Sequence, residues 1–460
     1  MNEFSVINDM ENKYPVETII AEDVPVWQFL RNIYADVLYK SHFSFSPPKK
    51  TKRLTNLIKV LPNYFWEKQN KKNDYSAILF TDTLEERTID GLISDKIAHN
   101  ILMIMQNHIL VVLDPLGERH KSVSKYFHSD FLSIYRFVLP AKLFWHKLKI
   151  HNSYILDEIE SDIGIKINYV NCVNQFFRYV KVFHKWLKIT RPKVIYVNCY
   201  FSLKHQALIY AAKLNNVITV ELQHGIISKA QTAYAQQKKM GRHSFPDYLL
   251  SFGEIEKSQV SPYFVSLKNI FPIGNYYLEY INSKKTNPKI ENFFMSLRNN
   301  YNKIVIISAQ ELIEQKLISF LSEAATKLPD VAFLLFLRKR NAKKISLTIS
   351  KQNNLLIPPN FDLYECCNYC DYHTTVFSTF AIEALFLGVP TIFININSLS
   401  EEFYSELLTK HIGVKCANNI KEYTEIVENW KIPTNIKKQS KKYFSDNNYN
   451  QINSFINSHL

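Results

Sequence analysis

The fold of this chain can be inferred first from residues 193–225, KVIYVNCYFSLKHQALIYAAKLNNVITVELQHG. Two short apolar runs, 193–199 and 217–223, are rich in the β-branched and aromatic residues that favour strands. Between them, residues 202–216 have the apolar periodicity of an amphipathic helix with two asparagines at its end. A strand, a helix and a strand at this spacing predict a parallel βαβ unit.

The alternation of strand and helix patterns continues on both sides of this unit. Further apolar runs of strand length lie at residues 76–80, 108–114 and 248–253. Residues 271–293 interrupt the pattern with prolines, a glycine and a polar run, which indicates a linker. A second alternating series follows, with strand-like runs at 303–308, 331–338, 354–358, 373–378 and 390–395 and helical patterns over 311–328 and 379–388.

Two such series predict an α/β protein with two Rossmann-like, doubly wound domains that face a central cleft. In folds of this kind, ligands bind at the carboxyl ends of the parallel strands. We expect four segments: a helical lead-in packed on the first domain at 1–70, the first domain at 71–275, the second domain at 276–435, and a C-terminal helix at 436–460.

Composition limits the class of protein. Of the 460 residues, 46% are apolar and 21% are charged, which suits folded domains and excludes a disordered chain. The N-terminus lacks the pattern of a secretory signal, and no apolar run approaches the ~18 residues that span a bilayer. Because the six cysteines form no regular framework, we expect reduced thiols and a cytoplasmic location.

The net charge of +14 leaves the kind of partner open. A basic surface can bind nucleic acid, an anionic membrane or anionic small molecules, and it can also be simply solvated. We find no nucleic-acid motif, and the basic residues are not concentrated in one stripe. Lys49, Lys50, Lys52 and Arg53 stand beside apolar residues and would suit a membrane surface, although the solvated edge of a packed helix is the simpler explanation.

Polar residues end the strand predicted at 217–223. Glu221 and His224 follow its apolar part, and Gly225 comes next. Ending a buried strand in polar groups is unfavourable unless they are hydrogen-bonded or take part in chemistry. Histidine suits proton transfer near neutral pH or contact with a phosphate oxygen, and glycine lets a ligand approach the backbone. We therefore expect a functional site here, which the nearby Tyr234 would adjoin.

A second candidate site lies in residues 371–394. Ser378 and Thr379 close a strand pattern, and a helix pattern starts at about Phe380, so the free N–H groups of that helix would form an anion site. Glu383 comes one turn later, where its carboxylate could accept hydrogen bonds from ribose hydroxyls. An ordinary N-cap with a glutamate in the first turn gives the same pattern. The residues alone do not decide between the two.

Taken together, these segments resemble a known family. Four motifs follow one another in order: E-L-Q-H-G at 221–225, F-P-D-Y-L-L-S-F-G at 245–253, P-I-G-N at 272–275, and S-T-x-x-x-E-A-L-x-x-G-x-P-T at 378–391. The pattern is similar to that of GT-B glycosyltransferases and related bacterial proteins of capsule and lipopolysaccharide biosynthesis. It covers roughly residues 190–395, and it identifies a superfamily rather than a particular sugar.

The resemblance implies roles for individual residues. Ser378 and Thr379 would bind the phosphate of a nucleotide-sugar donor, and Glu383 would hold its ribose. His224 would be a base or a phosphate ligand, and Gly274 would mark the passage to the second domain. The fold usually works without a divalent cation, and no D-x-D pair stands at a strand end here. We therefore expect no metal and no cofactor, with the nucleotide sugar as co-substrate.

The resemblance also implies substrates for a glycosyltransferase. A serine–threonine pair at a helix N-terminus suits a single phosphate, which favours a CMP-linked acidic sugar such as Kdo or sialic acid as donor, while a UDP-sugar stays open. The acceptor would be a surface-polysaccharide or lipopolysaccharide glycan, or a lipid-linked glycan. Such an acceptor would place the protein in the cytoplasm, with a peripheral contact at the cytoplasmic face of the inner membrane as a further option.

Other candidates stand near the ends of predicted strands. On the donor side these are Gln310 and Arg338, and on the acceptor side they are Arg87, Asp114 and Tyr234. Asp82 and Glu221 join His224 as catalytic candidates, because a carboxylate can take the proton from an acceptor hydroxyl. Acidic residues after strands are also ordinary helix N-terminal charges, so the residue types alone do not identify the base.

One motif has an alternative interpretation. Cys367-x-x-Cys370 with His373 has the residue types of a zinc site, but no second pair of ligands lies at suitable spacing, which favours buried thiols.

Two alternatives to a transferase remain open for the whole chain. A nucleotide-sugar epimerase of the same fold is one of them. A non-enzymatic, basic nucleic-acid-binding protein is the other.

Overall fold

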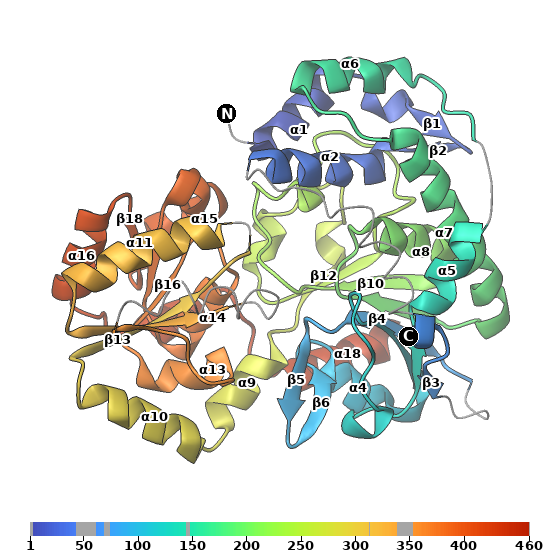
Figure 1. Cartoon of the computed structure of the whole chain (residues 1–460). Helices are drawn as coiled ribbons and strands as arrows, with labels where there is room; N and C mark the ends of the chain where they lie inside the picture. The colour runs from blue at the N-terminus through green and yellow to red at the C-terminus, as the bar shows by residue number, and fades with distance from the viewer. Residues whose placement is uncertain are drawn as a thin grey trace. The chain divides into compact units, whose positions relative to one another are not determined.

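The computed structural model describes residues 3–42, 61–68, 74–143, 148–311, 313–337 and 353–459. The chain divides into two compact units, the first made of Met1–Tyr276 with Ser445–Leu460 and the second of Tyr277–Phe444. Each unit has a parallel sheet with helices on both faces, as Figure 1 shows. The expected α/β class with two Rossmann-like domains is confirmed.

The sheet of the first unit has seven parallel strands and one short antiparallel edge strand. Its order is β12-β11-β10-β9-β4-β7-β8-β3. The strands are β3 (Glu67–Lys68), β4 (Ala77–Asp82), β7 (Ile109–Asp114), β8 (Phe131–Ser133), β9 (Val194–Val197), β10 (Ile218–Leu222), β11 (Tyr248–Ser251) and β12 (Ile270–Pro272). The chain runs outward from β4 to one edge and returns to continue from β9 on its other side, so the strand order reverses between β4 and β9.

The βαβ unit predicted around residue 200 is present. It consists of β9, helix α8 (Leu203–Lys213) and β10, which pairs with β9 in parallel. Ser202 starts the helix, because its side chain accepts a hydrogen bond from His205 N at 3.3 Å. Successive residues of β9 enter two different cores, with Ile195 on one face and Tyr196 on the other.

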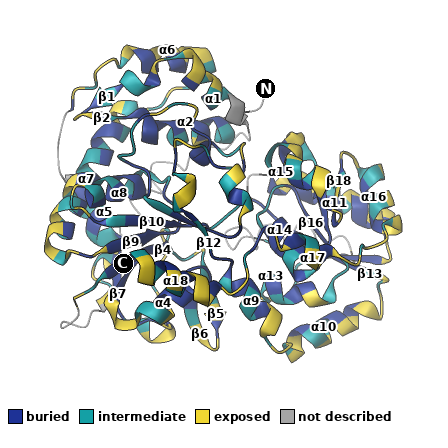
Figure 2. Ribbon diagram, turned by 180° about the vertical axis from the view of Figure 1, so that it is seen from behind, coloured by how far each residue is buried: buried dark blue, intermediate teal, exposed yellow. Residues whose placement is uncertain are grey.

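Helices cover both faces of this sheet, and Figure 2 shows their outer sides exposed and the strands buried. The larger core takes residues from α1 (Glu3–Lys13), α2 (Trp27–His42), α5 (Tyr135–Leu143), α6 (Tyr154–Ile163), α7 (Tyr169–Thr190) and α8. The smaller core takes residues from α4 (His99–Met105) and α18 (Asn448–His459). Within the lead-in expected at 1–70, α2 is a packed part of the first unit, while Lys49, Lys50, Lys52 and Arg53 lie outside the described residues.

Two small hairpins decorate the first unit. β1 (Ile20–Ala21) pairs with β2 (Val24–Pro25), and β5 (Glu86–Ile89) pairs with β6 (Leu92–Asp95). The second hairpin turns at Asp90 and Gly91, which have φ of 47° and 86°. A two-residue Asp-Gly turn with both φ positive matches the twist of a hairpin.

The second unit contains a six-stranded, fully parallel sheet of order β15-β14-β13-β16-β17-β18. Its strands are β13 (Lys303–Ser308), β14 (Val331–Phe336), β15 (Leu355–Leu356), β16 (Tyr372–Thr375), β17 (Thr391–Ile394) and β18 (Val414–Ala417). The helices include α9 (Tyr276–Ser283), α10 (Pro288–Arg298), α11 (Glu314–Lys327), α13 (Leu363–Cys366), α14 (Phe380–Leu387), α15 (Leu399–Lys410), α16 (Ile420–Asn429) and α17 (Ile436–Ser440). In chain order the strands run 3-2-1-4-5-6, the Rossmann order, which reverses between β13 and β16.

The C-terminal segment differs from the expected helix at 436–460. Its first part, α17, stays in the second unit, and the chain rejoins the first unit at Ser445. There α18 packs through Ile452 and Phe455, and Asn448 donates a hydrogen bond to the carbonyl of Ile273 at 2.8 Å. The sequence of α18 does not indicate which unit the helix packs on, because it is mostly polar and its apolar residues lie on one narrow face.

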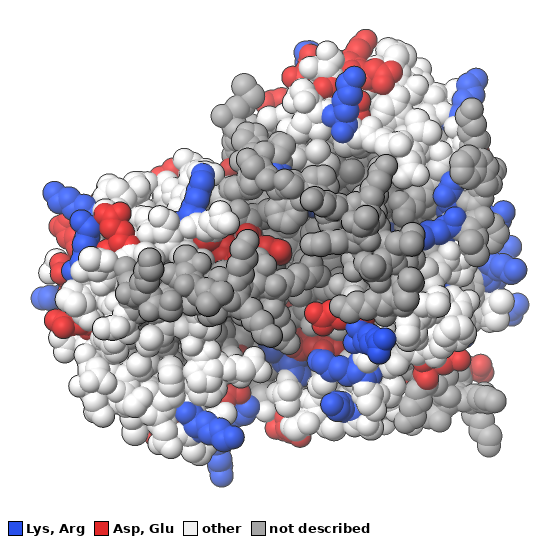
Figure 3. Space-filling model, in the orientation of Figure 1, with Lys and Arg blue, Asp and Glu red and all other residues white. Residues whose placement is uncertain are grey.

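Among the described residues, no helix is long and apolar enough to cross a membrane. On the face drawn in Figure 3, the Lys and Arg side chains of the described residues are interspersed with Asp and Glu.

Candidate functional site

Each sheet has a point at which the strand order reverses, and ligands bind at such points in open α/β sheets. In the first unit, β4 ends in Asp82 and β9 is followed by Asn198 on either side of the reversal. In the second unit, β13 is followed by Gln310 and β16 by Ser378. Three of these four residues are among the candidates from the sequence.

A buried network fills the reversal point of the first unit. Asn198 Nδ2 donates to Asp95 Oδ2 at 2.7 Å and lies 2.8 Å from Thr81 Oγ1. The Thr81 hydroxyl donates to Asp95 Oδ2 as well. Asp95 Oδ1 accepts from the amides of Ile97 and Ala98, at 2.8 Å each, just before α4 begins. Sequence reasoning missed Asp95, because it stands before the N-cap Ala98 and only the fold brings its partners together.

Asp82 stands at the carboxyl end of β4 and is partly exposed. Its Oδ1 accepts a hydrogen bond from Leu84 N at 2.8 Å. Burial and the nearby Glu85 raise the pKa of this carboxyl to about 7. Asp82 can therefore both give and take a proton near neutral pH.

Glu85 and Lys96 form an ion pair beside Asp82. Their side chains are 12% and 10% exposed, and Lys96 Nζ lies 3.4 Å from Glu85 Oε2. Burial opposes ionisation of Glu85, but the charge of Lys96 keeps the pKa of its carboxyl below the usual value. Lys96 was not found from the sequence, because a single lysine after a strand gives no distinctive signal.

His224 follows the last residues of β10 and lies among these groups. Its imidazole has a hydrogen bond to the backbone of Asn198, and burial lowers its pKa below 6.5, so the ring is neutral at pH 7. Nδ1 is buried without a partner in the described chain, which leaves Nε2 to donate to Asn198. The lone pair then resides on Nδ1. That nitrogen is suited to accept a proton.

Gln223 fixes the backbone on both sides of His224. Its side chain is 1% exposed, and Nε2 donates to Gly225 O at 2.9 Å and to Glu256 Oε1 at 3.0 Å. Oε1 accepts from Phe252 N at 2.5 Å. At this strand end, Gln223 thus uses its side chain for hydrogen bonds, whereas the Nδ1 atom of His224 has no partner in the described chain.

Glu221 and Tyr234 contact each other away from this cluster. Because successive residues of a strand point to opposite faces, Glu221 enters the larger core, where it is fully buried. The Tyr234 hydroxyl, itself buried, donates to Glu221 Oε1 at 2.7 Å. Burial raises the pKa of Glu221 to about 8. The sequence predicts a catalytic Glu221 and an acceptor-side Tyr234; in the structure both side chains are buried and contact each other.

The remaining acceptor-side candidates make internal contacts. Asp114, at the end of β7, forms an ion pair with Lys204 of α8, which outweighs burial and keeps its pKa below the usual value. Arg87 donates from Nη1 to the carbonyls of Leu84 and Glu86, at 3.0 and 2.8 Å. Both residues also act on the group around His224 through their charges, because Arg87 lowers the pKa of Glu85 and Asp114 raises the pKa of Asp82.

A small cavity lies beneath the β5–β6 hairpin, next to Asp82. Its volume is about 20 Å³, enough for one or two small atoms or groups, and its walls are largely apolar. The lining includes Leu79, Asp82, Ile93, Asp95, Leu102 and Tyr126.

In the second unit, the loop after β16 is held by Gln310. The side-chain Oε1 of this residue accepts from Phe377 N at 3.1 Å and from Thr375 Oγ1 at 3.5 Å. Gln310 is 6% exposed, so it shapes the loop that leads into α14. Gln310 lies just after β13, as the sequence predicts, and its Oε1 contacts a backbone amide and a threonine hydroxyl.

Ser378 and Thr379 lie at the start of α14 and are partly exposed. Thr379 is the N-cap but makes no side-chain cap bond, whereas Ser378 Oγ accepts from Phe380 N at 3.3 Å. Tyr404 OH donates to Ser378 O at 2.6 Å and fixes the turn. The Thr379 hydroxyl is therefore not used as a cap at this helix N-terminus.

Glu383 lies in the first turn of α14 and is 3% exposed. Its Oε2 accepts a hydrogen bond from Tyr364 OH at 2.8 Å, and Tyr364 in turn stands edge-on to Phe380. The tyrosine orients the carboxylate in a buried setting. Arg338, the other donor-side candidate, lies outside the described residues.

Gly274 and His373, the histidine of the cysteine motif, both have contacts within the fold. Gly274 follows β12 with φ of 77° and donates from its amide to Phe252 O at 3.1 Å, two residues before the border of the first unit. His373 is fully buried in β16, between Ser308 Oγ at 2.8 Å and Thr391 Oγ1 at 3.1 Å. The described residues contain no group of three side chains that could hold a metal ion.

Comparison with known proteins gives structural neighbours only. No protein-family model matches the chain, and no curated protein matches it. The S. aureus MnaA–UDP co-structure has a TM-score of 0.53 and 11% identity over 84% of this chain and 97% of that chain. Anabaena Alr3699/HepE in complex with UDP and glucose has a TM-score of 0.52 and 14% identity over 84% of this chain and 100% of that chain.

A third similar structure is Methanocaldococcus jannaschii UDP-GlcNAc 2-epimerase in complex with UDP-GlcNAc and UDP. It has a TM-score of 0.50 and 12% identity, and the match covers 84% of this chain and 99% of that chain. At such low identity the likeness shows the fold alone. The chain therefore has the two-domain, GT-B-like fold of these structures.

Proposed function

We propose that this chain is an enzyme that binds a UDP-sugar and epimerises the sugar by proton transfer. The observation that carries the proposal is the pair of groups at the first reversal point: a neutral His224 whose buried Nδ1 has no hydrogen-bond partner in the described chain, and Asp82 with a pKa of about 7. A base and an acid on one edge of a sheet suit a reaction that removes a proton and returns one.

The choice of nucleotide rests on the fold. All three similar structures described above contain UDP, and one of them is a UDP-GlcNAc 2-epimerase. This supports UDP in place of the CMP-linked donor that the sequence pattern favours. In the second unit, the N-terminus of α14 with Ser378 and Thr379 would receive the phosphates, and Glu383 the ribose.

The chemistry follows from the protonation states. His224 Nδ1 would take the proton from sugar C2 while the bond between C1 and the UDP oxygen breaks, so that the electron pair of the C–H bond leaves with UDP; its Nε2–H would stay bonded to the backbone of Asn198. The imidazolium formed would be stabilised by the ionised Glu85, which already interacts with this ring. Asp82 would return a proton to the opposite face of C2 as the bond between C1 and UDP reforms, which gives the epimer. The unpartnered Nδ1 of His224 suits the role of base, and the raised pKa of Asp82 suits the role of acid.

Sugar transfer is the second candidate, and the order of sequence motifs from E-L-Q-H-G to S-T-x-x-x-E favours it. In that case His224 would remove the proton of an acceptor hydroxyl. The two reactions differ in one requirement, because transfer needs an acceptor and epimerisation does not.

Isothermal titration of the full chain with UDP, CMP and UDP-GlcNAc tests the proposal. UDP and UDP-GlcNAc are expected to bind at least about tenfold more tightly than CMP, because each carries a second phosphate for the helix N-terminus. Incubation with UDP-GlcNAc alone should yield a second sugar nucleotide by ¹H NMR. Equal binding of CMP and UDP, or turnover that depends on an added glycan acceptor, would overturn the epimerase proposal.

A further inference from the structure

The connection between β10 and β11 is unusually long for a loop inside a compact domain. It runs over residues 223–247, all of them described, and contains one short 3₁₀-helix, η4 (Thr232–Tyr234). Loops longer than about 12–15 residues without regular structure of their own are uncommon and are usually functional. This loop begins with His224, so its conformation determines where the imidazole lies.

The backbone of the loop is held by side chains from the two N-terminal helices. Such contacts are informative because backbone polar groups in a buried loop need partners that no regular structure supplies. Three side chains of α1 and α2 contact four backbone groups: Glu11 Oε2 accepts from Gln237 N at 2.7 Å, Gln28 Oε1 accepts from Ser244 N at 3.1 Å, Gln28 Nε2 donates to Met240 O, and Arg31 Nη1 donates to Thr232 O.

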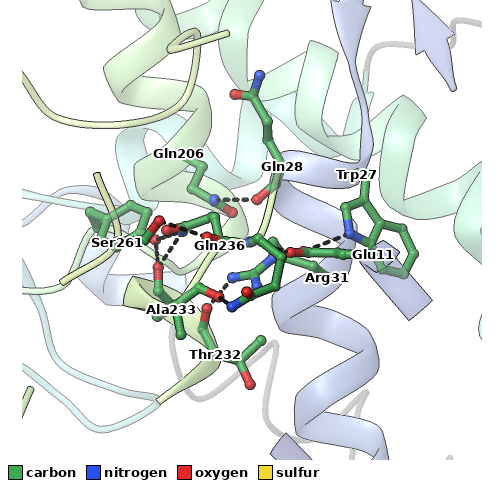
Figure 4. Close-up of polar contacts among 12 residues, drawn as sticks. Glu11, Trp27, Gln28, Arg31, Gln206, Thr232, Ala233, Gln236 and Ser261 are labelled. Atoms are coloured by element: carbon green, nitrogen blue, oxygen red, sulfur yellow. Dashed lines mark hydrogen bonds and ion pairs between the residues drawn. The ribbon is translucent and has the colours of Figure 1, made fainter. Parts of the chain in front are cut away.

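A buried ion pair stands at the centre of these contacts. Arg31 Nε lies 2.5 Å from Glu11 Oε1, and both side chains are fully buried. Trp27 Nε1 donates to the same carboxylate oxygen at 2.9 Å, as Figure 4 shows. An ion pair removed from water is seldom a net gain in stability unless its remaining donors and acceptors are also paired. Here Arg31 Nη1 and Glu11 Oε2 bond to the loop, while Arg31 Nη2 has no partner among the described residues.

The other side of the loop is fastened to the body of the unit. Tyr200 OH and Gln236 Nε2 both donate to Ala233 O, and Ser261 Oγ donates to Gln236 O at 2.6 Å. Gln206 of α8 donates to Gln28 O at 3.1 Å and joins helix α2 to the same region (Figure 4). The loop is thus held from both sides by side chains that lie far from it in the sequence.

Several polar atoms in this region are buried without a partner in the described chain. They include Arg31 Nη2, Thr232 Oγ1 and Gln236 Oε1. A structure selected for stability alone would pair such atoms or replace them with apolar groups. Their presence indicates that the conformation of the loop, rather than the number of its hydrogen bonds, is what the helices maintain.

We propose that α1 and α2 act as a template that sets the conformation of residues 223–247, and that Glu11 and Arg31 are positioning residues for His224. The proposal rests on the proposed function of His224 as the base. It assigns the N-terminal helices, which the sequence indicates only as a lead-in packed on the first domain, a role in the active site.

Hydrogen–deuterium exchange of the full chain tests the template. The double variant Glu11→Leu/Arg31→Met removes both charges together and keeps apolar packing between the helices. Gln28→Met is a second variant that removes two loop contacts and buries no charge. In both variants, peptides from residues 225–245 should exchange at least about tenfold faster, while peptides from α7 keep their protection. Lys13→Met, which breaks an exposed ion pair of α1 with Asp162, is the matched control and should change neither.

Kinetics test the link to His224. Turnover should fall at least about tenfold in both loop variants while the Kd for UDP stays within about twofold, because the nucleotide contacts lie in the other unit. In a His224→Ala background the same variants should cause no further loss.

Unchanged exchange in the loop, or an equal loss of protection in α7, would overturn the template. A full additional rate loss in the His224→Ala background would overturn the positioning role. If the wild-type chain turns over no UDP-sugar, the proposed function fails, and the exchange data still decide whether α1 and α2 hold the loop.

Discussion

His224 and Asp82 owe their proposed roles to different causes. His224 is neutral because burial disfavours the imidazolium, and Asp82 keeps its proton to about pH 7 because burial and Glu85 disfavour the carboxylate. One group is therefore ready to accept a proton under conditions in which the other can still donate one.

This pair predicts a bell-shaped pH dependence of kcat/KM. Activity should fall as the pH drops through the pKa of His224, below 6.5, because the base becomes protonated. It should also fall above about 7, because Asp82 loses the proton that it must donate. In Asp82→Asn, we expect kcat to drop by about 10²–10⁴ and the upper limb to disappear. Activity that rises steadily above the pKa of Asp82 would contradict its role as the acid.

Because the pKa of Glu221 is raised in the fold, we expect the stability of the protein to depend on pH through this group. Its pKa is raised from 4.5 in the unfolded chain to about 8 in the fold, so between these values the folded state holds a proton that the unfolded state has released. The stability contributed by this group is complete below 4.5 and declines as the pH rises through about 8. Glu221→Gln stays neutral and should escape this decline.

Calorimetric unfolding of wild type and Glu221→Gln at several pH values would measure the difference. The variant should gain relative stability from about pH 5.5 to about pH 8.5, by about 2 kcal/mol or more. Tyr234→Phe serves as a control, because it removes the donor to Glu221 without removing the titrating group. A difference between variant and wild type that stays constant with pH would show that Glu221 does not titrate in this range.

At the level of single residues, the sequence could indicate where chemistry is concentrated but not which atoms are open. The strand end at 221–225 contained one open histidine nitrogen, one structural glutamine and one core glutamate. The surroundings of these three side chains depend on the alternation of faces along β10 and on partners such as Tyr234 and Phe252, which only the fold brings together. Lys96 and Asp95 were missed for the same reason.

Among the elements, α1 and α2 depend on one buried ion pair. Arg31→Met alone would leave Glu11 charged and unpaired in the core, which should destabilise the fold by about 3–5 kcal/mol. Replacing both residues, as in Glu11→Leu/Arg31→Met, should restore much of that loss. Thermal unfolding followed by circular dichroism compares the two. An Arg31→Met protein as stable as the double variant would show that the pair contributes little.

Helix α14 makes a separate prediction for nucleotide binding. Tyr364 orients the Glu383 carboxylate that we assign to the ribose, so Tyr364→Phe should weaken UDP binding about three- to tenfold. Tyr301→Phe removes an exposed hydroxyl that donates to Asn353 O in the same unit and should leave the affinity unchanged. Titration calorimetry measures both. Equal affinities in the two variants would remove Glu383 from the nucleotide site.

The elements themselves could be predicted well, because apolar runs and helical periodicity stand out along most of the chain. The βαβ unit at β9, α8 and β10 follows directly from its pattern. The packing of α1 and α2 on the loop after β10 could not be foreseen. It depends on side chains of residues 11–31 meeting backbone groups of residues 232–244, a pairing with no local signal.

For the whole molecule, the two Rossmann-like units follow from the break in pattern after residue 270. The strand order places a reversal point in each sheet, and the candidate residues collect at both. The path of the C-terminus could not be predicted, since α18 returns to the first unit through two apolar side chains and an asparagine. The chemistry of the substrate was also beyond the sequence, because anion sites at helix N-termini are alike for CMP and UDP.

The central claim is that the chain epimerises a UDP-sugar with His224 as the base. Incubating the protein with UDP-GlcNAc in deuterated water and following the sugar by NMR tests this most directly. We predict deuterium at C2 and a second sugar nucleotide with wild type, and at least about a hundredfold slower incorporation with His224→Gln. A UDP-GlcNAc that keeps its C2 proton with wild type, or an unchanged rate in His224→Gln, would contradict the account.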